Sequence, residues 1–166
     1  MVTKEIIRSQ YLASLEMLNQ AIRQCPEYLW DDAKFTNQFW QIAYHALFFT
    51  HLYLQTSEED FIPRNMHYEN AHRFSSPQPK LSGEGEEDGS YHQEEILEFL
   101  DFCRQEVEDK VADLDLEADS GFDWIPFDKQ ELQFYNIRHL QHHTGELCER
   151  LGTVAGIDIK WVGMMN

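Results

Sequence analysis

Residues 39–54, "FWQIAYHALFFTHLYL", form the most apolar stretch of the chain, and this stretch decides the fold class. Apolar residues occupy most sides of a helix drawn over residues 36–55. A helix that is apolar nearly all round is buried among other helices. The stretch contains two histidines and a glutamine, and it falls short of the roughly 20 apolar residues of a membrane span. It therefore predicts the buried helix of a helical bundle.

A further helix is predicted on each side of this stretch. Over residues 3–24 apolar side chains recur at steps of three and four, and Pro26 ends the pattern. The helix after the apolar stretch begins at Ser90, whose spacing to Gln93 is that of a capping box. Its apolar stripe continues to Leu114. Each of these helices has one apolar face to bury against a neighbour.

The fourth predicted helix runs from about Asp128 to Leu151. Glu131 completes a second capping box with Asp128, and Gly152 is the expected C-terminal stop. A chain of 166 residues suits one domain, which we expect to span residues 1–166. The predicted fold is all-α: a four-helix bundle with a long crossover connection between its second and third helices.

That connection, residues 56–89, is rich in proline, glycine and acidic residues. So long a loop is unusual in a compact domain. Two interpretations stay open: a disordered acidic insertion, or a crossover that returns the chain to the other end of the bundle and leaves the second and third helices parallel. We expect an ordered first half, whose aromatic residues can pack over the bundle, and a mobile second half.

Charge and cysteine spacing limit the partners and the compartment. The formal net charge of −17 argues against nucleic acid and anionic membranes, because both would be repelled. Cys25, Cys103 and Cys148 form no CxxC pair, which is typical of reduced thiols. The N-terminal segment lacks the uninterrupted apolar core of a signal peptide. These features indicate a soluble cytoplasmic protein.

Three histidines lie within the five residues "HLQHH", 139–143, of the fourth predicted helix. His139 and His143 are four residues apart and lie within about 40° of each other around the helix. His142 lies about 60° to the other side of His139, nearer the edge of that face. Two histidines one turn apart supply half of a metal site, so a further ligand must come from another element.

His45, inside the apolar stretch, is the candidate for that ligand. Its neighbours on the helical wheel are mostly core-like, and burying an unpaired imidazole is costly. Taken alone, a histidine such as His45 on an apolar helix face is more often a hydrogen-bonded core residue than a ligand, and an isolated HxxxH pair is a weak signal. The combination of His45 on one helix with His139 and His143 on another favours a metal site.

The remaining histidines are weaker candidates. His51 lies about 120° from the sector of His45 and is expected at a surface or boundary position. His67 and His72, in the connection, form a second candidate pair of ligands. Loop histidines five residues apart beside proline and aromatic residues are usually solvated or capping residues. The helical histidines are therefore favoured over the loop pair.

One histidine in "WQIAYHALFF", residues 40–49, followed by HxxxH in "NIRHLQHHTGEL", residues 136–147, resembles the DinB-like superfamily of four-helix bundles. The resemblance covers the chain from the first predicted helix to residue 151. The ligand positions of the family fall on His45, His139 and His143. Gly145 also matches the family motif, whereas Glu146 departs from it, because related sequences often have glutamine there.

The resemblance implies a divalent metal ion, commonly nickel or zinc, held by three imidazoles with open positions for water or substrate. Family members with assigned activities include metal-dependent thiol-S-transferases and mycothiol-dependent isomerases, although a fold does not fix a reaction. The expected function is that of a metal-dependent thiol-S-transferase or hydrolase. Its expected substrate is a small molecule, such as a low-molecular-weight thiol.

Residues around the predicted ion receive secondary roles. Glu146 or His142 is the candidate proton acceptor, and Gln41 or Asn136 could orient a ligand. The alternative function belongs to another class: a non-catalytic bundle, stabilised by the metal, that acts as an interaction protein through a homodimer. A structural site is closed by four protein ligands, whereas a catalytic site keeps one position open.

Overall fold

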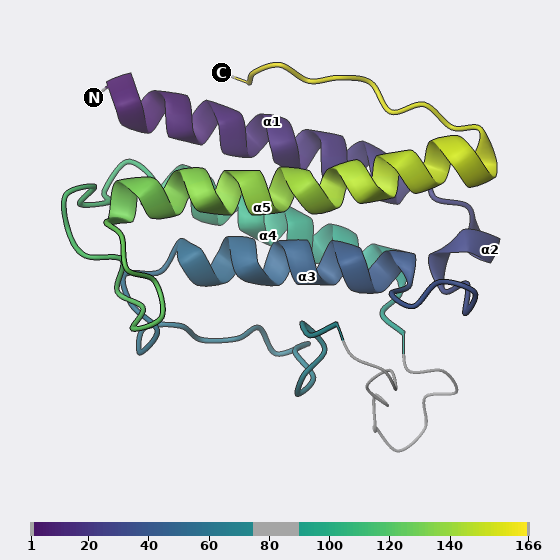
Figure 1. Ribbon diagram of the computed structural model, residues 1–166, viewed down its shortest axis with the longest axis horizontal. Helices are drawn as coiled ribbons and strands as arrows, with labels where there is room; N and C mark the ends of the chain where they lie inside the picture. The colour runs from purple at the N-terminus through teal and green to yellow at the C-terminus, as the bar shows by residue number, and fades with distance from the viewer. Residues whose placement is uncertain (1, 75–89, 166) are drawn as a thin grey trace.

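The computed structural model describes residues 2–74 and 90–165. The helices within these ranges are α1 (Val2–Gln24), α2 (Glu27–Trp30), α3 (Phe39–Tyr53), α4 (Gln93–Lys110), α5 (Lys129–Arg150) and a π-helical segment η1 (Leu151–Ala155) (Figure 1). These ranges contain no β-strand and only an isolated bridge between Asp119 and Asp128. The predicted all-α class is confirmed.

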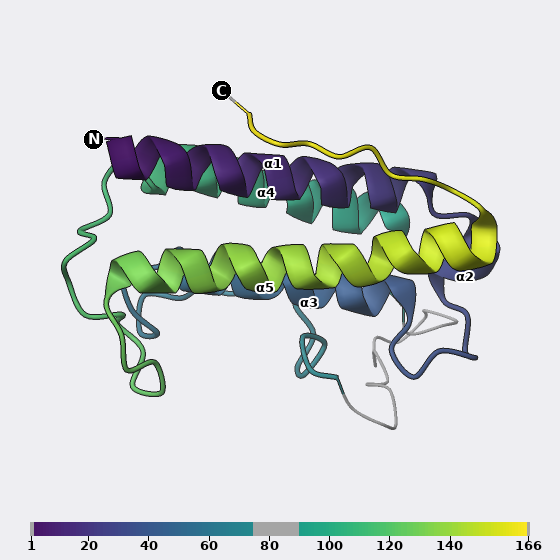
Figure 2. The ribbon, with the colours of Figure 1, turned by 45° about the horizontal axis from the view of Figure 1, so that its top comes forward.

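The four long helices lie side by side around one apolar core (Figures 1 and 2). Helices α1 and α3 each contact both α4 and α5. Arg8 near the start of α1 pairs with Glu108 near the end of α4, so these two helices are antiparallel. Lys129 at the start of α5 donates to the carbonyl of Gln55 just after α3, so this pair is antiparallel too. Gln55 also donates to Glu106 of α4, so α3 and α4 run in the same direction.

Helix α3 is the buried helix that its composition predicts. Thirteen of its 15 residues are buried, and each large apolar side chain among them contributes about 1.5–3 kcal/mol by leaving water. The two exceptions, His45 and Phe49, are half-buried. Both contact His72 of the connection, so the incompletely covered side of α3 faces that segment.

Two helix boundaries differ from the sequence-based expectation. Helix α4 begins at Gln93 rather than Ser90, with His92 as its N-cap and the Glu95 carboxylate accepting from the His92 backbone N–H at 2.7 Å. The acidic residue three positions on thus defines a different cap from the one predicted. Helix α5 continues into η1 past Gly152, and the turn comes at Gly156, whose φ of +67° favours glycine.

The start of α5 is as predicted. Asp128 is the N-cap, and its Oδ1 accepts a hydrogen bond from the backbone N–H of Glu131 at 2.8 Å. This bond satisfies one of the amides that the first helical turn leaves without a partner. The cap therefore sets where the histidine-bearing helix begins.

The first half of the connection, residues 56–74, runs along the outside of α3 (Figure 1). It is held by Tyr91, whose hydroxyl donates to the carbonyl of Met66 at 2.5 Å and accepts from the backbone N–H of Tyr68 at 3.1 Å. Residues 75–89, for which mobility was predicted, lie outside the described residues. Among the helices of the described ranges, none combines the length and hydropathy that crossing a membrane requires.

Candidate metal centre

The antiparallel packing of α3 and α5 brings three histidines together. The Nε2 atoms of His45 and His139, 94 residues apart in sequence, lie 3.1 Å from each other. The ring centre of His143 lies 4.7 Å from that of His45 and 4.6 Å from that of His139. One nitrogen from each ring lies within 4.8 Å of the other two. The three residues predicted as ligands thus converge on one point.

Polar contacts between α3 and α5 fix how the two helices are aligned along their length. The side chain of Gln133 donates to the carbonyl of Tyr53 at 3.4 Å. One turn later, Asn136 donates to the carbonyl of Thr50 at 3.3 Å. Side chains three residues apart on a helix share a face, so the next position along this face of α5 is that of His139. Asn136, predicted to orient a ligand, is here engaged with α3.

Hydrogen bonds orient two of the three rings. Nδ1 of His45 donates to the carbonyl of His72 at 2.6 Å, which leaves the lone pair of His45 on Nε2. Nδ1 of His143 lies 2.6 Å from Oε2 of Glu146, and this carboxylate can only accept the proton. A partner on one ring nitrogen that aims the other is typical of histidines that ligate metals.

His139 decides whether the group fits an ion. Its Nδ1 is buried without a partner among the described residues. If Nε2 carries the proton it can donate to His45, but Nδ1 is then a buried acceptor without a donor, which is costly. If Nδ1 carries the proton, the lone pairs of two Nε2 atoms face each other at 3.1 Å.

The separation of those two atoms matches a shared ion. Two nitrogen ligands with metal–nitrogen bonds of about 2.1 Å and bond angles of about 90–109° lie about 3.0–3.4 Å apart. The observed 3.1 Å between Nε2 of His45 and Nε2 of His139 falls in that interval. Imidazole is a common ligand of zinc, copper, iron and nickel. The residues present therefore fit a divalent cation.

The rings are neutral at ordinary pH, as ligation requires. Burial lowers the pKa of His45 to about 3, with the neighbouring imidazoles of His143 and His139 adding to the shift. Burial likewise lowers the pKa of His139 to about 4. The pKa of His143 is also lowered by burial, although Glu146 opposes the shift. No proton has to leave these rings before they can bind a cation at pH 7.

The two residues predicted as proton acceptors lie at the rim of the group. Glu146 contacts Nδ1 of His143 and is not one of the three converging ligands, but with His142 and His143 it forms a second group that could hold an ion. The side chain of His142 is 68% exposed, and its Nε2 lies 3.9 Å from the Glu146 carboxylate. Their catalytic roles stay predictions. The position of Glu146 makes it a partner of a ligand.

The loop histidines are engaged elsewhere. Nδ1 of His67 lies 2.5 Å from the hydroxyl of Tyr44. The ring of His72 stacks on Phe48 with centres 4.1 Å apart. Neither residue belongs to the groups of the described residues that could hold an ion. The contribution of the connection is instead the backbone carbonyl of His72, which the sequence could not reveal because every residue carries the same carbonyl.

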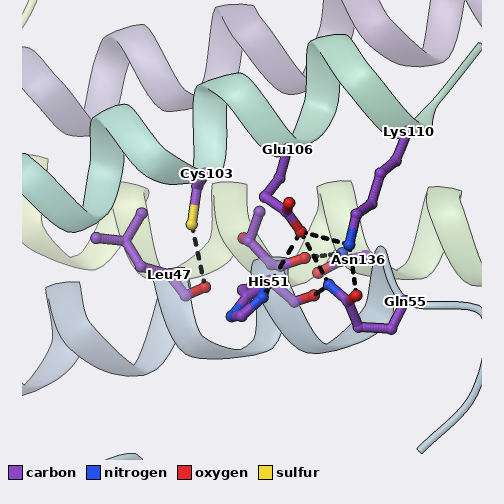
Figure 3. Close-up of polar contacts among 8 residues, drawn as sticks. Leu47, His51, Gln55, Cys103, Glu106, Lys110 and Asn136 are labelled. Atoms are coloured by element: carbon purple, nitrogen blue, oxygen red, sulfur yellow. Dashed lines mark hydrogen bonds and ion pairs between the residues drawn. The ribbon is translucent and has the colours of Figure 1, made fainter. Parts of the chain in front are cut away.

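The predicted surface or boundary position of His51 is wrong. Its side chain is buried between α3 and α4, where Nε2 lies 3.6 Å from the Glu106 carboxylate (Figure 3). Lys110 and Gln55 also bind that carboxylate, at 2.7 and 3.0 Å. Burial lowers the pKa of His51 to about 4, which Glu106 opposes and Lys110 reinforces. The error arises because α3 is covered on almost every side, so distance from one sector does not mean exposure.

Comparison of this chain with known protein families, with curated proteins and with solved structures finds no match. The function therefore has to be argued from the geometry and chemistry of the three-histidine group itself.

Proposed function

We propose that this chain is a metal-dependent enzyme, a four-helix bundle of the DinB-like kind that holds one divalent ion, nickel or zinc, through His45, His139 and His143. The observation that carries the proposal is the 3.1 Å approach of two imidazole Nε2 atoms, with a third imidazole in reach of both. Nitrogens at this distance suit two ligands of one ion, whereas a hydrogen bond between the two rings would leave Nδ1 of His139 a buried acceptor without a donor among the described residues.

The surrounding residues support the role of the three ligands. The carbonyl of His72 holds the ring of His45 in one orientation, and Glu146 does the same for His143. A carboxylate on the outer nitrogen also makes an imidazole a stronger donor. A divalent ion held by neutral imidazoles keeps its full charge and lowers the pKa of a bound water or thiol toward neutrality. The proposed reactions are thiol transfer to an electrophile, or hydrolysis.

An enzyme is favoured over a structural clip by the number of ligands. A structural site is closed by four protein ligands, whereas a catalytic site keeps a position open. Among the described residues the group comprises three, and the Glu146 carboxylate is engaged with Nδ1 of His143. His45 and His139 are only half-buried, whereas His143 is buried.

The proton acceptor in this proposal is His142 rather than Glu146. Glu146 already accepts from His143, so protonating it would remove the partner of a ligand. His142 lies beside His143, with ring centres 4.9 Å apart, and is open to solvent with which it can exchange protons. An acceptor of this kind must reach the proton directly or through one water.

Metal titration tests the proposal. Protein stripped of metal is titrated with zinc, nickel and cobalt in a calorimeter, and close to one ion per chain is expected. His139→Ala and His143→Ala should each abolish this binding, while His142→Ala should leave the affinity unchanged. A wild-type chain that takes up none of the three metals, or binding that survives both ligand substitutions, contradicts the proposal.

A second measurement separates catalysis from a structural role. In the cobalt-loaded protein the visible absorption bands report the ligands of the ion. If added azide or imidazole changes these bands, a coordination position is open, as an enzyme requires. Bands that no added ligand changes would mean a closed site and would favour the non-catalytic dimeric bundle.

A further inference from the structure

Residues 72–74 pass beside the three histidines and are attached to α3 at two successive carbonyls. The carbonyl of His72 accepts from Nδ1 of His45 at 2.6 Å, and the carbonyl of Arg73 accepts from the side chain of Gln41 at 3.3 Å. Gln41 and His45 are one helical turn apart, so both bonds come from one face of α3. The backbone that leads into Phe74 is therefore held at two points.

The ring of Phe74 lies against two of the three imidazoles of the candidate metal centre. It stacks on His45 with ring centres 4.1 Å apart and planes inclined by 20°. It also stands edge-on to His143, with centres 5.4 Å apart. Phe49 contacts the same group from α3, at 4.8 Å from His45 and 5.3 Å from His139. Phenyl rings from two elements thus form apolar walls around the imidazoles.

Of these two rings, Phe74 is the more exposed to solvent. It is 37% exposed, whereas Phe49 is packed against the apolar core. A phenyl ring offers no conventional hydrogen bond to an incoming molecule, so it acts on that molecule through its bulk and its aromatic faces. Pockets that discriminate by volume separate ligands that differ by one methylene by roughly 10–200-fold. A fused ring is a larger difference than one methylene.

We propose that Phe74 is the specificity-determining residue of the metal centre: its ring limits the size of the donor molecule that reaches the ion. A compact donor such as imidazole enters without hindrance, and the binding of a benzo-fused donor is weakened. This inference rests on the proposed function, because it needs an ion with an open position. It also specifies the substrate: the atom that binds the ion carries only a small group on the side that faces Phe74.

The test compares two ligands on the cobalt-loaded protein. Wild type and Phe74→Ala are titrated with imidazole and with benzimidazole, and the visible cobalt bands are followed. Phe74→Ala should bind benzimidazole about tenfold more tightly than wild type, while its affinity for imidazole changes by less than about twofold. The ratio of the two affinities is compared between proteins, so the different basicities of the ligands cancel.

Two further variants control the result. Phe61→Ala removes an aromatic ring from the same connection, where it contacts Phe48 and His51 and none of the three ligands. It should keep the wild-type ratio. Phe74→Leu keeps apolar bulk over His45 and should give a ratio between those of wild type and Phe74→Ala.

Each outcome has one meaning. Cobalt bands that respond to ligands, with the same ratio in wild type and Phe74→Ala, would overturn the inference and leave the proposed function standing. A wild-type chain that gives no cobalt bands would overturn both. A Phe74→Ala chain that folds but no longer binds cobalt, with Phe74→Leu at the wild-type ratio, would make the ring a support for His45 and also overturn the inference.

Discussion

His45 and His51 lie six residues apart on the same buried helix, yet their surroundings give them different chemistry. Nε2 of His45 faces another imidazole, and its Nδ1 is held by the carbonyl of His72. Nε2 of His51 faces Glu106, which also binds Lys110 (Figure 3). Both rings are neutral because burial lowers their pKa values. The difference teaches that a buried histidine is a candidate metal ligand where the lone pair of its unprotonated nitrogen faces the lone pairs of other ligating nitrogens.

The largest expected effect is on the stabilisation by zinc, which should depend on the region of His45 and not on the region of His51. Zinc at about 1,000 times its dissociation constant should raise the free energy of unfolding of the wild type by about 4 kcal/mol, since it binds only the folded chain. His139→Ala should lose this increment, and His51→Leu should keep it. Urea denaturation with and without zinc measures both. An increment lost in His51→Leu and kept in His139→Ala would reverse the comparison.

The next effect concerns the pH dependence of stability that His51 contributes. Without metal, His51 takes up a proton at about pH 4 when folded and at about pH 6.5 when unfolded. Between these values the unfolded chain binds more protons, so stability falls as the pH falls, by about 3 kcal/mol for this group. Between pH 7 and pH 4, His51→Leu should lose that much less stability than the wild type.

Urea denaturation at several pH values measures this difference. Other buried histidines add to the pH dependence of both proteins, so only the difference between the two belongs to His51. Parallel curves for wild type and His51→Leu would contradict the assigned environment of the ring.

A smaller effect concerns the carboxylate on each side of the comparison. Glu146→Ala removes the acceptor on Nδ1 of His143 and should weaken metal binding by about 10–100-fold. Glu106→Gln, in the other region, should leave the metal affinity unchanged. Glu149→Ala, whose parent carboxylate binds Thr153, is the matched control on α5. Calorimetric titration with zinc measures all three, and equal affinities throughout would remove Glu146 from the centre.

The smallest effect tests whether stability and metal binding can be separated on α5 itself. Asp128→Ala removes the N-cap contact to Glu131 and should cost about 1 kcal/mol of unfolding free energy. The zinc affinity of the folded protein should not change, because the contacts of Gln133 and Asn136 with α3 lie between the cap and His139 and hold the ligand in place. A loss of affinity as large as that of Glu146→Ala would show that the start of the helix sets the ligand geometry.

Several features of this protein were determined by local sequence. The apolar composition of residues 39–54 predicts a buried helix, and Asp128 with Glu131 predicts where α5 begins. The i, i+4 spacing of His139 and His143 puts both on one helical face. These inferences succeed because composition, capping and helical period act between residues close in the chain.

Other features were decided only by the tertiary structure. The carbonyl that orients His45 comes from His72, and the phenyl ring over it from Phe74, both in a connection whose path no periodicity predicts. The burial of His51 depends on α4 covering its side of α3, and the role of Glu146 depends on which nitrogen of His143 it meets. Each of these is a matter of distances and directions between side chains or backbone atoms after folding. Local sequence determines which groups are available, and packing determines which of them meet.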